Sequence, residues 1–193
     1  MKKSTYFIAS LLLLLFTTKS YNQKTAHNWD NYIASYEAGN LGSTTLRMDL
    51  INKAPVKEMP FVLMIGISYF TSRADGFPES ETFKMLHAVG NGLEQLITLE
   101  TDAVLAGSFM YQQERIEYFY IKDYEGLKEK IAHYFLENKI NLPYYIHIAE
   151  DREWDHYKKF LYPNEATLRS MAEKVLVKNL QEAEQTAPLG EGK

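Results

Sequence analysis

The stretch FVLMIGISYF, residues 61–70, is apolar at almost every position. A short run of this kind is typical of a β-strand that is buried on both faces, which requires a central place in a sheet. Polar loops enclose it: residues 52–60 carry two prolines and three charges, and residues 71–78 end in Pro78. We therefore expect the fold to be built around this strand.

The segments that follow predict how the sheet is completed. Apolar residues recur at helical spacing over 79–99 and again over 124–138. Residues 104–111, 115–122 and 144–149 read as strands, the first two forming a hairpin. From residue 61 the order is strand, helix, strand, strand, helix, strand. This order predicts an α+β protein with a ferredoxin-like split βαβ core, an antiparallel sheet and both helices on one face.

Glycines interrupt the first predicted helix at Gly90 and Gly92. Each costs about 1 kcal/mol relative to alanine inside a helix. Either the helix breaks there, or the glycines let it approach another element closely, and we expect the close approach. The small residues Ala106, Gly107 and Ser108 predict a place where a helix lies near the sheet.

Two further parts flank this core. Residues 29–37 and 43–50 predict an N-terminal hairpin around a turn at 38–42, added to the sheet or beside it. Near the C-terminus we expect a short helix before Pro163 and a long amphipathic helix over 164–186, followed by a disordered tail at 187–193. Either C-terminal helix could cover the second face of the sheet.

Residues 1–23 have the pattern of a secretory signal peptide. Lys2 and Lys3 precede an apolar run from Tyr6 to Phe16, which is too short to span a bilayer as a helix. We expect cleavage before Tyr21 or Gln23 and an exported chain, periplasmic or extracellular, that meets the membrane only during export. The alternative is a retained membrane anchor. The main domain is expected over 24–163.

Composition narrows the chemistry. The chain contains no cysteine, which excludes disulfides and thiolate sites. It has 21 basic and 25 acidic residues, and residues 1–23 hold three lysines and no acid, so 18 basic against 25 acidic residues remain, a net charge of −7. Nucleic acid requires a basic face, so it is not expected as a partner.

The segment REWDHYKKFLYP, residues 152–163, allows two interpretations. Trp154, Tyr157 and Leu161 fall on one helical face, which predicts a segment packed on the core, with Asp151 as N-cap. The functional alternative is a ligand pocket that combines these rings with Asp151, Asp155 and His156. We expect the main role of the segment to be packing that holds the fold together, and we call this role a structural staple.

Tyr118 and Tyr120 share one face of the predicted strand 115–122, whereas Glu117, Phe119 and Ile121 share the other. On an open sheet, the two tyrosines would form a platform for a peptide, a glycan or a partner's helix. The alternative is that the C-terminal helix or the N-terminal hairpin buries these rings.

Local catalytic motifs are not found in the sequence. The five histidines lack zinc-site spacing, and neither a G-x-S-x-G elbow nor a glycine-rich phosphate loop occurs. We therefore assign no catalytic residue, no metal ligand and no cofactor. The enzyme alternative requires a dispersed site, with Asp151, His156 and Glu117 meeting in one pocket.

Three segments resemble a known family: DGFPESE (75–81), GSFMYQQERIEYFYIKD (107–123) and DREWDHYKKFLYP (151–163). In this order they resemble the bacterial domain of unknown function family 695 over about residues 29–163. The third segment also looks like the end of the related regulators of ribonuclease activity. The resemblance implies a ferredoxin-like fold and no established activity. The signal peptide, the long C-terminal helix and Gly90-Asn91-Gly92 depart from the family pattern, and export argues against a ribonuclease-regulating role.

Taken together, these features predict an exported, non-enzymatic binding or regulatory module whose partner is a protein, a peptide or a small ligand. The candidate binding residues are Tyr118, Tyr120, Asp151, Trp154 and Tyr157. The alternatives are the dispersed-site enzyme and a structural protein of the cell envelope.

Overall fold

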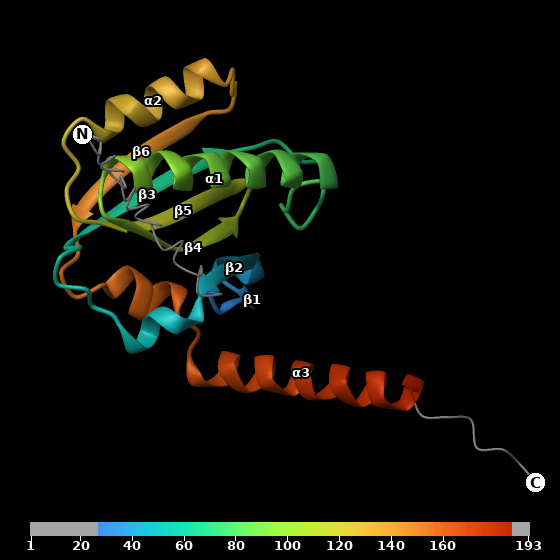
Figure 1. Ribbon diagram of the computed structural model, residues 1–193. Helices are drawn as coiled ribbons and strands as arrows, with labels where there is room; N and C mark the ends of the chain where they lie inside the picture. Colours follow the sequence, from blue (N-terminus) through green and yellow to red (C-terminus); the bar gives the residue numbers. More distant parts are fainter. Residues whose placement is uncertain (1–26, 187–193) are drawn as a thin grey trace, which may run out of the picture.

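A computed structural model describes residues 27–186 and places six strands in one antiparallel sheet, in the order β1-β2-β4-β5-β3-β6 (Figure 1). The strands are β1 (Trp29–Ser35), β2 (Leu41–Arg47), β3 (Phe61–Ser68), β4 (Ala103–Tyr111), β5 (Glu114–Ile121) and β6 (Tyr144–Glu150). The α-helices are α1 (Ser80–Glu100), α2 (Leu127–Glu137) and α3 (Glu165–Thr186). The predicted α+β class is confirmed.

Strand β3 lies inside the sheet, between β5 and β6, as its apolar sequence predicted. Leu63, Ile65 and Ile67 point to one face and are fully buried beneath α1 and α2. Val62 points to the other face and is also fully buried. Burial on both faces explains why this strand lacks the alternation of polar and apolar residues.

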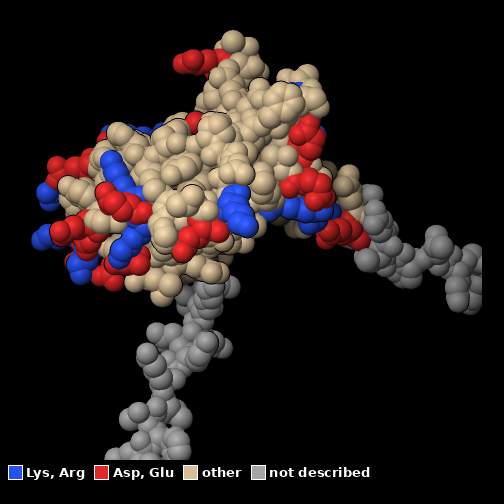
Figure 2. All heavy atoms as spheres, turned by 90° about the horizontal axis from the view of Figure 1, so that it is seen from above, with Lys and Arg blue, Asp and Glu red and all other residues tan. Residues whose placement is uncertain are grey.

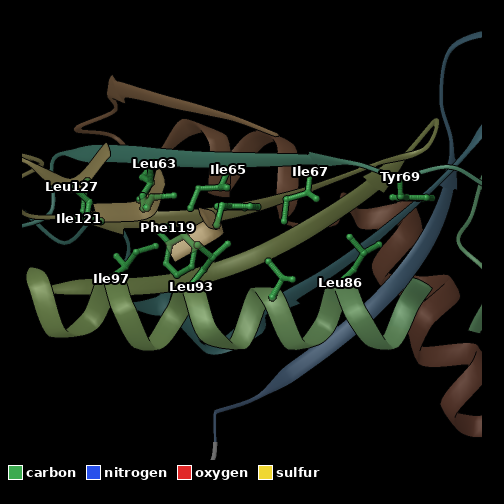
Figure 3. Close-up of a cluster of buried hydrophobic side chains, with 13 residues drawn as sticks. Leu63, Ile65, Ile67, Tyr69, Leu86, Leu93, Ile97, Phe119, Ile121 and Leu127 are labelled. Atoms are coloured by element: carbon green, nitrogen blue, oxygen red, sulfur yellow. The ribbon is translucent and has the colours of Figure 1, made fainter. Parts of the chain in front are cut away.

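Helices α1 and α2 cover the same face of the sheet (Figure 1). Leu86, Leu93 and Ile97 of α1 are fully buried, and Figure 3 shows them pointing from the helix toward the strands. From the sheet, Leu63 and Phe119 meet them. The helical spacing read from the sequence is therefore the buried face of α1.

The close approach predicted for the glycines of α1 is confirmed, and the helix is unbroken. A Cβ atom at Gly92 would lie 2.0 Å from the hydroxyl oxygen of Tyr134 in α2. A Cβ atom at Gly90 would lie 2.6 Å from Oε1 of Glu117 in β5. Both distances are shorter than real contacts, so side chains at these positions would force a shift.

The N-terminal hairpin extends the sheet, because β2 pairs with β4. Its predicted boundaries were wrong at both ends of β2. The turn is a short 3-10 helix, Glu37–Gly39, with Ala38 at φ 54°, and β2 already begins at Leu41. After Arg47 the chain forms a second 3-10 helix, Met48–Asn52, where a strand was expected.

The short C-terminal segment packs on the second face of the sheet, and α3 adds to it near its start, where Met171 packs against the same cluster. The short segment contains a π-helix, η3 (His156–Leu161), whose Tyr157 and Leu161 are buried. Helix α3 projects away from the sheet (Figure 1), and its Val175 and Leu176 are more than half exposed. Of the two helices expected as covers, the short segment therefore covers this face, and most of the long helix does not.

Helix α2 begins later than predicted, at Leu127, because Gly126 adopts a left-handed conformation with φ 67°. The predicted signal peptide at 1–23 and the predicted tail at 187–193 lie outside the described residues. Within residues 27–186, no helix is both long and apolar enough to cross a membrane.

Candidate functional site

A cleft of about 350 Å³ lies between α1 and the strands β2, β4 and β5. We call it the α1 cleft. Its floor carries polar side chains from three adjacent strands, namely Thr45, Ser108, Arg115 and Glu117. Polar residues at these inward positions are unusual, because the same face is apolar beneath the rest of α1.

Strand pairing aligns the polar side chains of the cleft floor with one another. Thr45 of β2 is directly opposite Ser108 of β4, and Ser108 is directly opposite Glu117 of β5. The three side chains therefore form a row across the sheet, with about 5 Å between neighbouring strands. A β-bulge between Leu105 and Gly107 shifts the alternation of β4, so that Ser108 lies on the same face as Leu105.

Arg115 and Glu117 form a buried ion pair in the floor. Nε of Arg115 donates to Oε1 of Glu117 at 2.6 Å, and the two side chains are 9% and 1% exposed. Among the described residues, no hydrogen-bond acceptor contacts the two Nη atoms of Arg115. Burying two charges costs several kcal/mol per ion in desolvation, so such a pair is weak evidence for a purely stabilising role.

Glycine determines how close α1 lies to this pair. Nη2 of Arg115 lies 3.6 Å from the position that a Cβ atom at Gly90 would take, and Oε1 of Glu117 lies 2.6 Å from it. Alanine at this position would force either the Glu117 carboxylate or the helix to shift. The absence of a side chain at Gly90 therefore leaves the charged groups against the helix backbone.

The wall of the cleft consists of His87, Asn91 and Glu94, which follow at helical spacing along α1. His87 and Asn91 are exposed, and Glu94 is half-buried. Trp29 of β1 also lines the cleft, with its side chain 40% exposed. The cleft thus combines an aromatic surface with hydrogen-bonding groups of both kinds.

The aromatic side of residues 152–163 is a structural staple. The indole of Trp154 is fully buried and stacks on Tyr120, with ring centroids 3.8 Å apart, and its N–H donates to the carbonyl oxygen of Met59 at 3.0 Å. The hydroxyl of Tyr157 donates to the carbonyl oxygen of Arg47 at 2.7 Å. The segment therefore ties the C-terminal part of the domain to β2 and β5.

Asp151 holds the start of this segment. Its Oδ1 accepts from the backbone N–H of Asp155 at 2.8 Å, and its Oδ2 accepts from the Tyr120 hydroxyl at 2.7 Å and the backbone N–H of His156 at 3.0 Å. Burial alone would raise the pKa of Asp151, but these hydrogen bonds offset it and leave the pKa below its usual range.

The predicted binding residues meet in this staple. Tyr120, Asp151, Trp154 and Tyr157 form one hydrogen-bonded and stacked network, while Tyr118 lies apart beside Phe160. Each of the five predicted residues is buried, with 8% exposure or less. The sheet surface around Tyr120 is therefore covered, and a binding role for these residues stays a prediction that requires the segment to move.

The residues of the enzyme alternative do not come together. Nδ1 of His156 lies 2.9 Å from Oδ2 of Asp151, but Glu117 belongs to the α1 cleft. Asp151 binds Tyr120, and Tyr120 and Glu117 point to opposite faces of β5 because their positions differ by an odd number. The proposed combination of Asp151, His156 and Glu117 is therefore wrong.

Of the residues that line the α1 cleft, the sequence interpretation named only Glu117 as a site residue and missed the others, among them Arg115 and Ser108. The alternation of β5 carried a signal, because Arg115 and Glu117 share the inward face with Phe119 and Ile121. Gly90 was a second signal, since its predicted close approach is to Glu117. Ser108 could not be assigned to this face, because the bulge in β4 breaks the two-residue period.

Surface charge on the face in Figure 2 is mixed, and the residues that the structure describes form no metal-ligand cluster. Figure 2 shows Lys and Arg side chains interspersed with Asp and Glu on the face seen from above, with no broad basic patch on that face. Within residues 27–186, no group of three or more His, Cys, Asp or Glu side chains is placed to hold a metal ion.

The fold and the cleft together define an antiparallel α+β domain with a polar cleft beside its first helix. Residues 27–162 match the model of a family of unknown function, DUF695, which covers more than half of the chain. The chain belongs to the DUF695 family, and the predicted resemblance to this family is confirmed, while the likeness to regulators of ribonuclease activity stays a prediction. No curated protein and no solved structure matches the chain significantly.

Proposed function

We propose that this protein is a non-enzymatic binding module whose ligand site is the α1 cleft. The observation that carries the proposal is the Arg115–Glu117 ion pair, which is buried in the floor of a cleft. A packed core would favour apolar residues at both positions. A ligand that hydrogen-bonds to these groups accounts for their presence.

Binding is favoured over catalysis by what the residues around the cleft can do. Glu117 is tied to Arg115, while the histidine and aspartate of the enzyme alternative lie on the other face of the sheet. The cleft has the size of a small-ligand site, and polar side chains from the sheet and from α1 line it. A small molecule therefore fits better than an extended peptide.

The test is equilibrium dialysis of the purified chain against a metabolite extract of the source cells, with mass spectrometry of the retained compounds. We expect the wild-type chain to retain a small molecule that the variant Arg115→Met/Glu117→Met does not retain. The matched control is Arg169→Gln, which changes an exposed arginine of α3. Equal retention by the cleft variant, or none by the wild type, would contradict the proposal.

We also propose that the protein acts outside the cytoplasm. The support is the signal-peptide pattern of residues 1–23, with its lysines, apolar run and polar end. The test is N-terminal sequencing of the chain recovered from the native envelope and culture fractions. A start near Tyr21 or Gln23 is the expected result, and an intact Met1 in the cytoplasmic fraction would count against export.

For the fold, we propose a ferredoxin-like split βαβ core, composed of β3, α1, β4, β5, α2 and β6. Three features support it: the strand order β4-β5-β3-β6, antiparallel pairing throughout, and two helices on the same face. An experimental structure with another strand order would contradict it.

A further inference from the structure

We infer that the ligand of the α1 cleft is a small neutral polyhydroxylated compound, such as a monosaccharide. This inference rests on the proposed function, since it names the ligand class of the same site. It depends on the charges of the cleft, its hydrogen-bonding groups, the position of Trp29 and the size of the space.

The charges of the cleft disfavour ionic ligands. Arg115 is compensated by Glu117 at 2.6 Å, and Glu94 adds a second carboxylate. An anion drawn to the guanidinium would meet both carboxylates. A cation would find one carboxylate outside the ion pair, that of half-buried Glu94, because Glu117 is already paired with Arg115. A neutral ligand avoids the repulsion that an anion meets and still gains charge-assisted hydrogen bonds.

The hydrogen-bonding groups call for a ligand that donates and accepts at neighbouring atoms. The Nη atoms of Arg115 only donate, the carboxylate of Glu117 only accepts, and the hydroxyls of Thr45 and Ser108 do both. Thr45, Ser108 and Glu117 lie in one row of about 10 Å across adjacent strands, and Arg115 lies two residues from Glu117 along β5, so donors and acceptors are neighbours. Hydroxyl groups on adjacent carbons satisfy such a row, because each one can donate and accept.

Trp29 supplies the apolar component. Its side chain lines the cleft and is 40% exposed, so part of the indole is available for contact. An aromatic ring gives a flat apolar surface on which the C–H side of a sugar ring can pack. The cleft volume of about 350 Å³ is near the lower end for small-ligand sites, which suits a single sugar ring and its bound water.

The chain also carries its own optical probe. It has two tryptophans, of which Trp29 lines the cleft and Trp154 is fully buried on the opposite face of the sheet. Ligand binding in the cleft should therefore change the emission of Trp29 and leave that of Trp154 unchanged. The variant Trp29→Phe should abolish the fluorescence response.

The experiment is a fluorescence titration of the full chain with glucose, galactose, mannose, N-acetylglucosamine and mannitol, and in parallel with glutamate, putrescine and phosphate. We expect saturable binding of at least one neutral compound. Ser108→Ala should weaken it about five-fold, because one hydrogen bond is worth about 1 kcal/mol. The matched control Ser170→Ala, on exposed α3, should leave the affinity unchanged.

The possible failures are distinguishable. Saturable binding of only a charged probe, weakened by Ser108→Ala, would overturn the ligand class and support the cleft as a binding site. Neutral binding that Ser108→Ala and Thr45→Val leave unchanged would place the sugar elsewhere and overturn the inference. No response to any neutral compound would overturn the ligand class, while the dialysis experiment decides separately whether the cleft binds a molecule.

Discussion

The two faces of β5 bury polar groups in different ways. On one face, Tyr120 stacks on Trp154 and shares its hydroxyl with Asp151 and the backbone of Tyr157. On the other face, Arg115 and Glu117 hold one another but border a cleft. The first arrangement closes on itself, whereas the second leaves hydrogen-bonding capacity for a ligand. Burial of a polar group therefore indicates function only when its partners are incomplete.

The largest expected effect on stability is on the face of β5 that carries Tyr120, which we call the closed face. Trp154→Ala removes a fully buried ring, its stacking on Tyr120 and its hydrogen bond to Met59. We expect the free energy of unfolding to fall by about 4 kcal/mol, measured by urea denaturation. Phe160→Ala, at a ring that is 37% exposed, should cost much less. A loss of less than about 1 kcal/mol in Trp154→Ala would show that the segment is not a staple.

The second-largest effect on stability is expected on the opposite face of β5, which borders the α1 cleft. Arg115→Met removes the partner of Glu117 and leaves a buried carboxylate uncompensated. We expect a loss of about 3 kcal/mol in the free energy of unfolding, by the same denaturation measurement. Arg73→Met breaks an exposed ion pair with Asp75 and should change stability far less than Arg115→Met does. A small effect of Arg115→Met would mean that the pair is solvated.

A smaller effect, with a change of sign, tests the contact between α1 and Glu117. Gly90→Ala should destabilise the wild-type chain by about 1–2 kcal/mol, because its Cβ would lie 2.6 Å from Oε1 of Glu117. In a Glu117→Ala background that obstacle is gone, and the same change should stabilise the chain through helix propensity. A double-mutant cycle measures the difference. Equal effects in both backgrounds would contradict the close contact.

The smallest effect is a pH dependence on the closed face. The pKa of Asp151 is lower in the folded chain than in the unfolded one, so its contribution is complete above the unfolded pKa of about 4 and is lost as pH falls. Asp151→Asn should therefore flatten the loss of stability between about pH 5 and pH 2, measured by denaturation at each pH. Asp49 has a pKa of about 2, lowered first by its hydrogen bond from Arg47, and should supply part of the remaining dependence. An unchanged pH profile in Asp151→Asn would contradict this role.

The sequence was most informative where a simple pattern of apolar residues reflects burial. The apolar run of β3 and the helical spacing of α1 predicted a central strand and its covering helix, because burial alone determines both patterns. Trp154, Tyr157 and Leu161 do pack together, as their spacing predicted. The predicted helix with Asp151 as N-cap was wrong, because Trp154 has φ 57° and the segment forms a π-helix that begins after Asp155.

The α1 cleft was harder to predict, because it depends on departures from these patterns. The bulge in β4 turns Ser108 toward α1, and the pairing of β2 with β4 brings Thr45 beside it. Neither the bulge nor the register can be inferred from the local residue types. The polar positions of β5 were visible in the sequence, but their cleft exists only once three strands and a helix are assembled.

The most direct test of the binding site is the double variant Arg115→Met/Glu117→Met, measured for both stability and ligand retention. Apolar residues of similar volume often replace a buried ion pair without loss of stability. We predict a folded chain at least as stable as the wild type that no longer retains the small molecule. A double variant that fails to fold, or that folds and still retains the ligand, would contradict the assignment of this pair to binding.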